Sequence, residues 1–174
     1  MKATASSIQI SAVPLFLETK GNLLKDYNAP GVEHITNDEL LTCECDVLIP
    51  AALENQITAE VAEKVKCSYI IEAANGPTSE ADDAVLEKRG IPVIPDIFAN
   101  CGGVIVSYFE WVQNIQELTW SRERVNEMLE DLMSKSFADI LSVKKEYQYT
   151  FRMAAYIVAL RKLVYAEEIK GIFP

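Results

Sequence analysis

Basic residues are scarce in this sequence: 16 Lys and Arg stand against 26 Asp and Glu, giving a formal net charge of −10. Proteins that bind nucleic acid or anionic membranes need clustered Lys and Arg to displace counterions. The charge balance therefore argues against both kinds of partner. Long apolar runs are lacking too, because no segment reaches the ~18 uninterrupted apolar residues of a membrane span. The first 17 residues resemble a signal peptide only faintly, since polar residues interrupt them and no small-residue cleavage site follows. We expect a cytoplasmic protein.

Candidate metal ligands are also few. The sequence has one His, His34, and four Cys: Cys43, Cys45, Cys67 and Cys101. One residue separates Cys43 from Cys45, which is closer than zinc ligands usually stand, and no second pair of ligands follows. We interpret the cysteines as buried, reduced thiols in a reducing compartment and expect no metal site.

Apolar residues, in contrast, make up 49% of the 174 residues, enough to build the core of one domain. Three short apolar runs, at 46–49, 68–71 and 91–94, are rich in β-branched residues and are bounded by turn formers, which predicts strands. Helical patterns with capping residues lie between them, at 58–66 and 80–89. This alternation predicts a parallel sheet. The runs do not alternate apolar with polar residues, so we expect both faces of the sheet to be covered.

Long helices are predicted after residue 95, over 102–116, 121–146 and 153–169. The first of these is apolar almost all round, so we expect it to be buried on several sides. Thr36-x-x-Glu39 has the spacing of a capping box and predicts an earlier helix. Residues 1–34 are hard to interpret: 8–13 could form an edge strand and 16–27 a loose helix. The sequence as a whole predicts an α/β fold, a partial Rossmann-like doubly wound parallel sheet followed by long C-terminal helices.

Ligands bind open parallel sheets in the crevice beyond the carboxyl ends of the strands. Here those ends are the loops at 50–52, 73–77 and 95–103, which combine small residues with Asn side chains. Small residues let a flat ligand approach the backbone, and amides can both donate and accept hydrogen bonds. Asn-Gly-Pro and Gly-Gly are also ordinary turn chemistry. From these residues alone, a ligand site and a purely structural role are both open.

Several stretches, in this order along the chain, closely resemble glutamate dehydrogenases. They are Ile-Pro-Ala-Ala-Leu-Glu-Asn-Gln-Ile-Thr at 49–58, Glu-Ala-Ala-Asn-Gly-Pro-Thr at 72–78, Pro-Asp-Ile-Phe-Ala-Asn-Cys-Gly-Gly-Val-Ile-Val-Ser-Tyr-Phe-Glu-Trp at 95–111, and Arg-x-Ala-Ala-Tyr at 152–156. The resemblance covers about residues 35–172. It implies that 35–174 form part of an NAD(P)-binding domain, in a family that converts glutamate to 2-oxoglutarate and ammonia.

The resemblance also implies roles for particular residues. Ala51 and Ala52 would lie against the adenosine side of NAD or NADP. Asn75 would reach the nicotinamide ribose or its carboxamide, and Asn100 would bind at the nicotinamide end. Val104 and Ser107, on one face of a helix, would contact the side-chain carboxylate of glutamate. For Ser107 an alternative is open, because a Ser in an apolar helix often bonds the carbonyl four residues earlier.

The sequence departs from the family pattern in several places. Ala73 stands where the family usually has Gly, and Cys101 where it usually has Ala. No G-x-G-x-x-G is present, so the turn that brings a helix N-terminus to the pyrophosphate is missing from this chain. The family's substrate-binding lysine and its proton-transfer lysine and aspartate have no counterpart either. We therefore expect a fragment with no catalytic residues of its own, inactive alone, with weak or absent dinucleotide binding.

Three hypotheses remain open from the sequence. The chain could be a piece of a glutamate dehydrogenase, a non-catalytic interaction or regulatory module derived from one, or a piece of a related amino-acid dehydrogenase. The run at 104–111 favours glutamate dehydrogenase over the third hypothesis. We also expect a homo-oligomer, with a dimer favoured, because a sheet that starts midway exposes an edge and the last helix would leave Ile157, Leu160 and Val164 uncovered.

Overall fold

The computed structural model describes residues 26–171, which divide into two units between Leu40 and Leu41. The predicted strand at 8–13, and nearly all of the predicted helix at 16–27, lie outside the described residues. Helix α2 (Asn37–Leu41) spans the boundary between the units and begins at the predicted capping box. The Thr36 backbone N–H donates to the Glu39 carboxylate at 2.8 Å, and the Glu39 N–H donates to the Thr36 hydroxyl at 3.2 Å. These reciprocal bonds satisfy two N–H groups that the helix start would leave unpaired.

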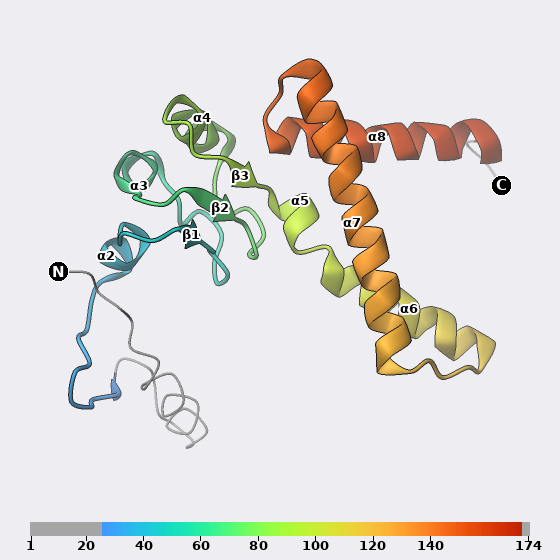
Figure 1. Cartoon of the computed structure of the whole chain (residues 1–174), viewed down its shortest axis with the longest axis horizontal. Helices are drawn as coiled ribbons and strands as arrows, with labels where there is room; N and C mark the ends of the chain where they lie inside the picture. Colours follow the sequence, from blue (N-terminus) through green and yellow to red (C-terminus); the bar gives the residue numbers. More distant parts are fainter. Residues whose placement is uncertain (1–25, 172–174) are drawn as a thin grey trace. The chain divides into compact units, whose positions relative to one another are not determined.

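The second unit contains a three-stranded parallel sheet in the order β1-β2-β3 (Figure 1). The strands are β1 (Val47–Leu48), β2 (Tyr69–Ile71) and β3 (Val93–Ile94), each inside a predicted run. Helix α3 (Ala59–Lys64) joins the first two strands, and α4 (Glu80–Lys88) joins the last two. Thr58 caps α3, as the sequence predicts, and of the two possible caps Thr78 and Ser79 it is Ser79 that caps α4. The partial Rossmann-like α/β fold is therefore confirmed.

One face of the sheet forms the main core. The strand register places Leu48, Ile70 and Val93 in one row, and this row packs against Val61 of α3 and Leu86 of α4. Ile70 and Leu86 are completely buried. Burying side chains of this size contributes ~1.5–3 kcal/mol each. This core fixes where the strands end and so where the candidate site lies.

The other face of β1 and β2 is open among the described residues. Val47 and Tyr69 are partners in the register, and both side chains are exposed. The prediction that both faces are covered is therefore wrong for this part of the sheet. The reason is that β-branched, apolar strands show only that a face is suited to burial, and they do not show which segment of chain covers it.

Four helices follow the sheet. They are α5 (Asp96–Ala99), α6 (Gly102–Gln116), α7 (Arg122–Tyr147) and α8 (Phe151–Lys170). The three long ones agree with the predicted helices to within a few residues, whereas α5 was expected to be loop. A second core cluster joins α7 to α8 through Ile140, Val143, Ala154, Ala155 and Val158. No helix in the described part of the chain is long and apolar enough to cross a membrane.

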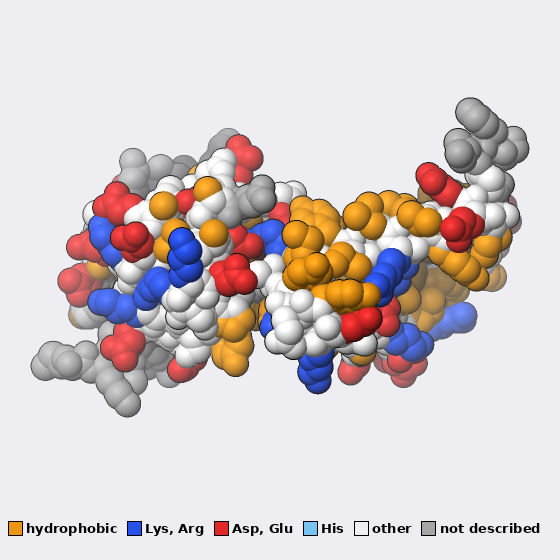
Figure 2. Space-filling view, turned by 90° about the horizontal axis from the view of Figure 1, so that it is seen from above, with side chains coloured by type: hydrophobic (Ala, Val, Ile, Leu, Met, Phe, Trp, Pro, Cys, Tyr) orange, Lys and Arg blue, Asp and Glu red, His pale blue; other side chains and the backbone are white. Residues whose placement is uncertain are grey.

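Helix α6 is less buried than its composition suggests. Phe109 is its one buried residue, and Val104 keeps 68% of its surface exposed. The prediction of burial on several sides is wrong within this chain, because α6 packs mainly on α7. Leu160 and Val164 of α8 are exposed as expected, whereas Ile157 packs against the second core. Figure 2 shows hydrophobic side chains gathered on the right-hand side of the view, where Figure 1 places these helices.

Candidate functional site

Backbone hydrogen bonds join the carboxyl ends of the strands into one rim. After β1, the Pro50 carbonyl accepts from the N–H groups of Ala73 and Ala74, which follow β2, at 3.1 and 2.9 Å. The Gly76 N–H in the second loop donates to the Asp96 carboxylate, at the start of α5, at 2.8 Å. The three predicted loops therefore open on the same edge of the sheet, as expected for parallel strands.

Two Asn side chains meet on this rim, although 25 residues separate them in the sequence. The Asn100 amide Nδ2 donates to Asn75 Oδ1 at 2.7 Å, and it also lies 3.4 Å from the Ala73 carbonyl oxygen. Asn75 is exposed and Asn100 is half-buried. We call these two residues the amide pair. The structure brings together the two polar residues that the sequence singled out after β2 and β3.

The loop that carries Asn75 depends on a glycine. Gly76 has φ +54°, in the left-handed region, and a Cβ added there would meet nothing within 4 Å. The requirement for glycine is therefore backbone conformation and not lack of space. With its N–H held by Asp96, Gly76 fixes the direction in which the chain leaves Asn75.

The other predicted site residues lie on surfaces near this rim or beyond it. Ala51 and Ala52 are exposed directly after Pro50. Val104 and Ser107 are exposed on α6, and no hydrogen bond of the described residues joins Ser107 to the amide pair. The Ser107 hydroxyl instead donates to the Gly103 carbonyl at 3.1 Å, the alternative contact left open above. Ser107 is therefore accounted for structurally in this chain without a ligand.

The expectation of buried cysteines holds for Cys67, but Cys45 and Cys101 are half-buried and Cys43 is exposed. Cys101, one of the departures from the family pattern, lies at the start of α6. Its Sγ is 3.4 Å from Met133 Sδ on α7. Burial raises the pKa of this thiol above its usual value, with a smaller opposing effect from its own backbone. The thiol therefore stays protonated and behaves as a small packing group between α6 and α7.

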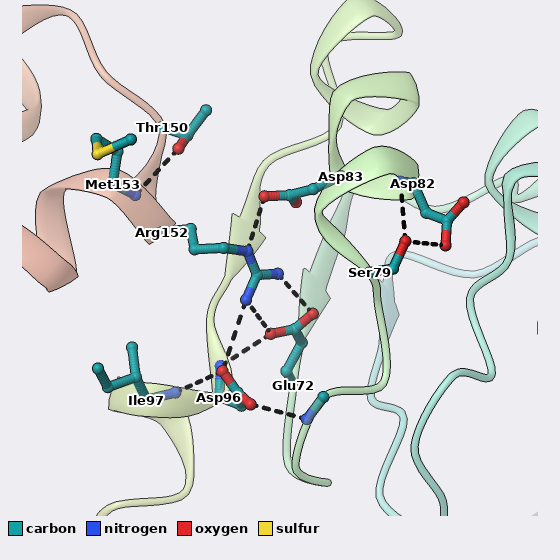
Figure 3. A network of polar contacts seen from close by, with 10 residues as sticks. Glu72, Ser79, Asp82, Asp83, Asp96, Ile97, Thr150, Arg152 and Met153 are labelled. Carbon is teal, nitrogen blue, oxygen red and sulfur yellow. Dashed lines mark hydrogen bonds and ion pairs between the residues drawn. The ribbon is translucent and has the colours of Figure 1, made fainter.

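Behind the rim lies a charge network built around Arg152, in the first turn of α8 (Figure 3). Its guanidinium donates to Glu72 through two nitrogens, at 2.8 and 3.0 Å, and to Asp83 through Nε at 2.8 Å. Asp96 Oδ1 lies 3.5 Å from Nη1. We call these four residues the Arg152 network. It ties the end of β2 to α4, α5 and α8.

The network is largely buried, and its cation is paired with carboxylates. The Arg152 side chain is 15% exposed, and that of Glu72 is 0% exposed. Burial alone would lower the pKa of Arg152, but the hydrogen bonds that it donates to Glu72 and Asp83 raise this pKa above the usual arginine range. Arg152 is therefore charged at every pH at which the protein is folded, and its planar fork matches the Glu72 carboxylate.

Sequence reasoning missed this network. In the sequence, Arg152 stands out only as the first residue of the motif at 152–156, and Glu72 only as the first residue of the motif at 72–78. One signal could have found Glu72: a carboxylate directly after the apolar run at 68–71 sits where a strand leaves the core. A buried charge there requires a partner. The sequence does not say which of the 16 basic residues supplies it.

A cleft between α4 and the start of α8 is distinct from the predicted site. It has a volume of about 660 Å³. Its charged lining consists of Asp83, Glu87, Asp96 and Arg152, and neither member of the amide pair lines it. Three carboxylates against one guanidinium disfavour the phosphates of a dinucleotide. The rim, and not this cleft, is the candidate site.

Open parallel α/β sheets bind their ligands at the carboxyl ends of their strands, and the amide pair lies at that edge of this sheet. The sequence model of the family "Glutamate/Leucine/Phenylalanine/Valine dehydrogenase" matches residues 4–171. This chain belongs to that family. The match includes most of the stretch at 1–34 that was hard to interpret from the sequence.

Several glutamate dehydrogenases are similar to this chain in sequence. The chain is 48% identical over 145 residues to a glutamate dehydrogenase of Thermotoga maritima, with 83% of this chain and 35% of that protein aligned. It is 46% identical over 156 residues to the NAD-specific glutamate dehydrogenase of Clostridioides difficile, covering 90% and 36%. A protein named as NADP-specific also matches.

Among solved structures, the hetero-hexameric glutamate dehydrogenase from Thermus thermophilus in its Leu-bound form superposes with a TM-score of 0.83. The sequences are 28% identical, and the alignment covers 96% of this chain and 38% of that chain. This chain therefore spans between about a third and two-fifths of the length of the relatives that it matches.

Proposed function

We propose that this chain forms the nicotinamide side of the NAD(P) site in a glutamate dehydrogenase-type enzyme, whose reaction is the oxidative deamination of glutamate to 2-oxoglutarate and ammonia. The observation that supports this most directly is the hydrogen-bonded amide pair at the rim. The cofactor is NAD or NADP, since relatives with either specificity match.

The amide pair has the right chemistry for a nicotinamide carboxamide. Its internal bond uses one N–H of Asn100 and the Oδ1 of Asn75. The Asn75 amide nitrogen can still donate, and the Asn100 amide oxygen can still accept. A carboxamide presents one acceptor and one donor group, so it can complete both residues. Ala51 and Ala52, which carry no bulk beyond Cβ, would let the adenosine side approach the backbone after β1.

Val104 and Ser107 are proposed to contact the side-chain carboxylate of glutamate. Their exposure on α6 leaves them open to a ligand. The Ser107 hydroxyl can turn from the Gly103 carbonyl to donate to a carboxylate, which is a stronger acceptor. The resemblance of the run at 104–111 favours glutamate over the apolar substrates of related dehydrogenases.

Replacing Asn100 with Ala is expected to weaken NADH binding about three- to tenfold, because one hydrogen bond contributes ~0.5–1.5 kcal/mol net. Calorimetric titration of NADH into the 174-residue chain measures this. We expect the unmodified chain itself to bind weakly, above low micromolar, since it has no phosphate-binding turn. Asn126→Ala is the matched control, because Asn126 is an exposed asparagine of α7 outside the three loops of the rim. Equal affinities for the Asn100 and Asn126 variants would contradict the proposed site.

The isolated chain is expected not to oxidise glutamate. The family's proton-transfer lysine and aspartate match no position in its sequence, and proton transfer alone typically supplies ~10²–10⁴-fold in rate. Absorbance at 340 nm, with glutamate and either NAD or NADP, measures turnover. A glutamate-dependent signal that scales with the concentration of the chain would show the proposal to be wrong.

A second role, as an interaction module, is favoured by one observation. Large apolar side chains on α6 and α8, including Trp111 and Leu160, are exposed in this chain. Large exposed apolar patches are uncommon on soluble monomers, and they often mark sites of interaction with another protein. The hetero-hexameric relative is an assembly by its name. Self-association of this chain, with the dimer as its simplest form, stays a prediction.

A further inference from the structure

Three consecutive residues anchor the start of α8. The Thr150 hydroxyl accepts from the Met153 N–H at 3.2 Å and caps the helix. The Phe151 ring stacks on Phe137 of α7, with centroids 6.1 Å apart. Arg152 then enters the charge network. The start of α8 therefore fixes where the guanidinium lies, and the guanidinium in turn fixes the carboxylates that it binds.

The carboxylates bound by Arg152 also accept hydrogen bonds from backbone N–H groups of the rim. Glu72 Oε2, which accepts from Arg152, also accepts from the Asp96 backbone N–H at 2.9 Å (Figure 3). Asp96 Oδ2 in turn accepts from the Gly76 N–H at 2.8 Å. Each step is a charge-assisted hydrogen bond, the stronger kind.

The path ends at the amide pair. Gly76 directly follows Asn75, and Asp96 begins the short helix α5 that Asn100 caps at its C-terminus. The Asn100 N–H donates to the Asp96 carbonyl at 3.2 Å. Asn100 is thus hydrogen-bonded directly to Asp96, and Asn75 is connected to Asp96 through the neighbouring Gly76. Neither of them hydrogen-bonds to Arg152.

We propose that Arg152 is a positioning residue that sets the geometry of the amide pair through Glu72 and Asp96. Three carboxylates from three elements converge on this one guanidinium, and without it they would repel one another. The Glu72 loop and the Asp96 helix would then separate, and the Asn100–Asn75 bond would lengthen with them. This inference rests on the proposed function only for the meaning of the amide pair. The coupling itself is a property of the chain.

Arg152→Lys tests the coupling, because lysine keeps the charge but cannot make the fork to Glu72 together with the bond to Asp83. In ¹⁵N-labelled 174-residue chain, the side-chain amide resonances of Asn75 and Asn100 are expected to shift. Solvent exchange of the Gly76 N–H should rise about tenfold. Arg161→Lys, the same change on an exposed residue of α8, should leave both unaltered. Unshifted amide resonances in folded R152K would overturn the proposal.

Asp96→Ala provides a second test that does not depend on folding of R152K. It removes the acceptor of the Gly76 N–H, and it should shift the same side-chain amides. If it does not, the path does not exist and the proposal fails. NADH titration is then a separate readout: R152K should lose about the same factor in affinity as D96A, and the double variant no more than either. Shifted amides with NADH affinity unchanged in both variants would reject the proposed function and leave the positioning role standing.

Discussion

Replacing Arg152 with Ala is expected to lower the free energy of unfolding by about 3–5 kcal/mol. The cost comes mainly from Glu72, whose side chain has no exposed surface. Without Arg152 its carboxylate would be buried beside Asp96 with no cation to compensate it. In an intact buried pair, the cost of desolvating both charges offsets most of the attraction between them. The large effect is therefore expected from breaking the pair, and chemical denaturation followed by circular dichroism measures it.

The origin of this cost can be tested with Glu72→Gln. Glutamine keeps the shape and an oxygen that can accept from the Asp96 N–H, but it carries no charge. The double variant R152A/E72Q is therefore expected to be more stable than R152A alone. Arg161→Ala, in the same helix but exposed, loses a hydrogen bond to the Tyr147 hydroxyl and should cost no more than about 1.5 kcal/mol. A double variant less stable than R152A would show that the orphaned carboxylate is not the cause.

Local signals in the sequence were enough to predict most of the elements. Thr58, Ser79 and Ser121 cap α3, α4 and α7, where a small polar residue precedes a periodic apolar run. Where signals were weak, the boundaries shifted. Helix α8 begins at Phe151, two residues before the predicted start, after a turn in which Gln148 has φ +56°. Gln rarely adopts that conformation, and this turn contains no glycine or proline that would mark it in the sequence.

The site was predictable in part, for a physical reason. Parallel strands all end at the same edge, so Asn75 and Asn100 could be expected on one rim from their places after predicted strands. The Arg152 network could not be predicted in this way. Arg152 lies 80 residues from Glu72, and nothing local in either segment selects the other as its partner. Burial of Glu72 creates the demand for a cation, and only the packing of α8 beside β3 determines which one meets it.

The main core sets the stability on which this rim depends, and Leu86→Ala is expected to lower the free energy of unfolding by about 2–5 kcal/mol. Leu86 of α4 has 0% of its surface exposed and lies in the cluster that includes Ile70 and Val93. Removing its side chain loses burial and leaves a cavity beneath the sheet that the neighbouring strands can fill only partly.

Leu163→Ala is the matched control for this substitution. Leu163 is also within a helix, α8, so the intrinsic gain in helix propensity is the same, but it is 62% exposed. Its replacement should therefore change stability by less than about 0.5 kcal/mol. Urea denaturation of both variants at equal, low protein concentration gives the comparison. Equal effects would mean that the sheet and α4 do not form the cooperative core of the chain, and that the rim is held by the Arg152 network alone.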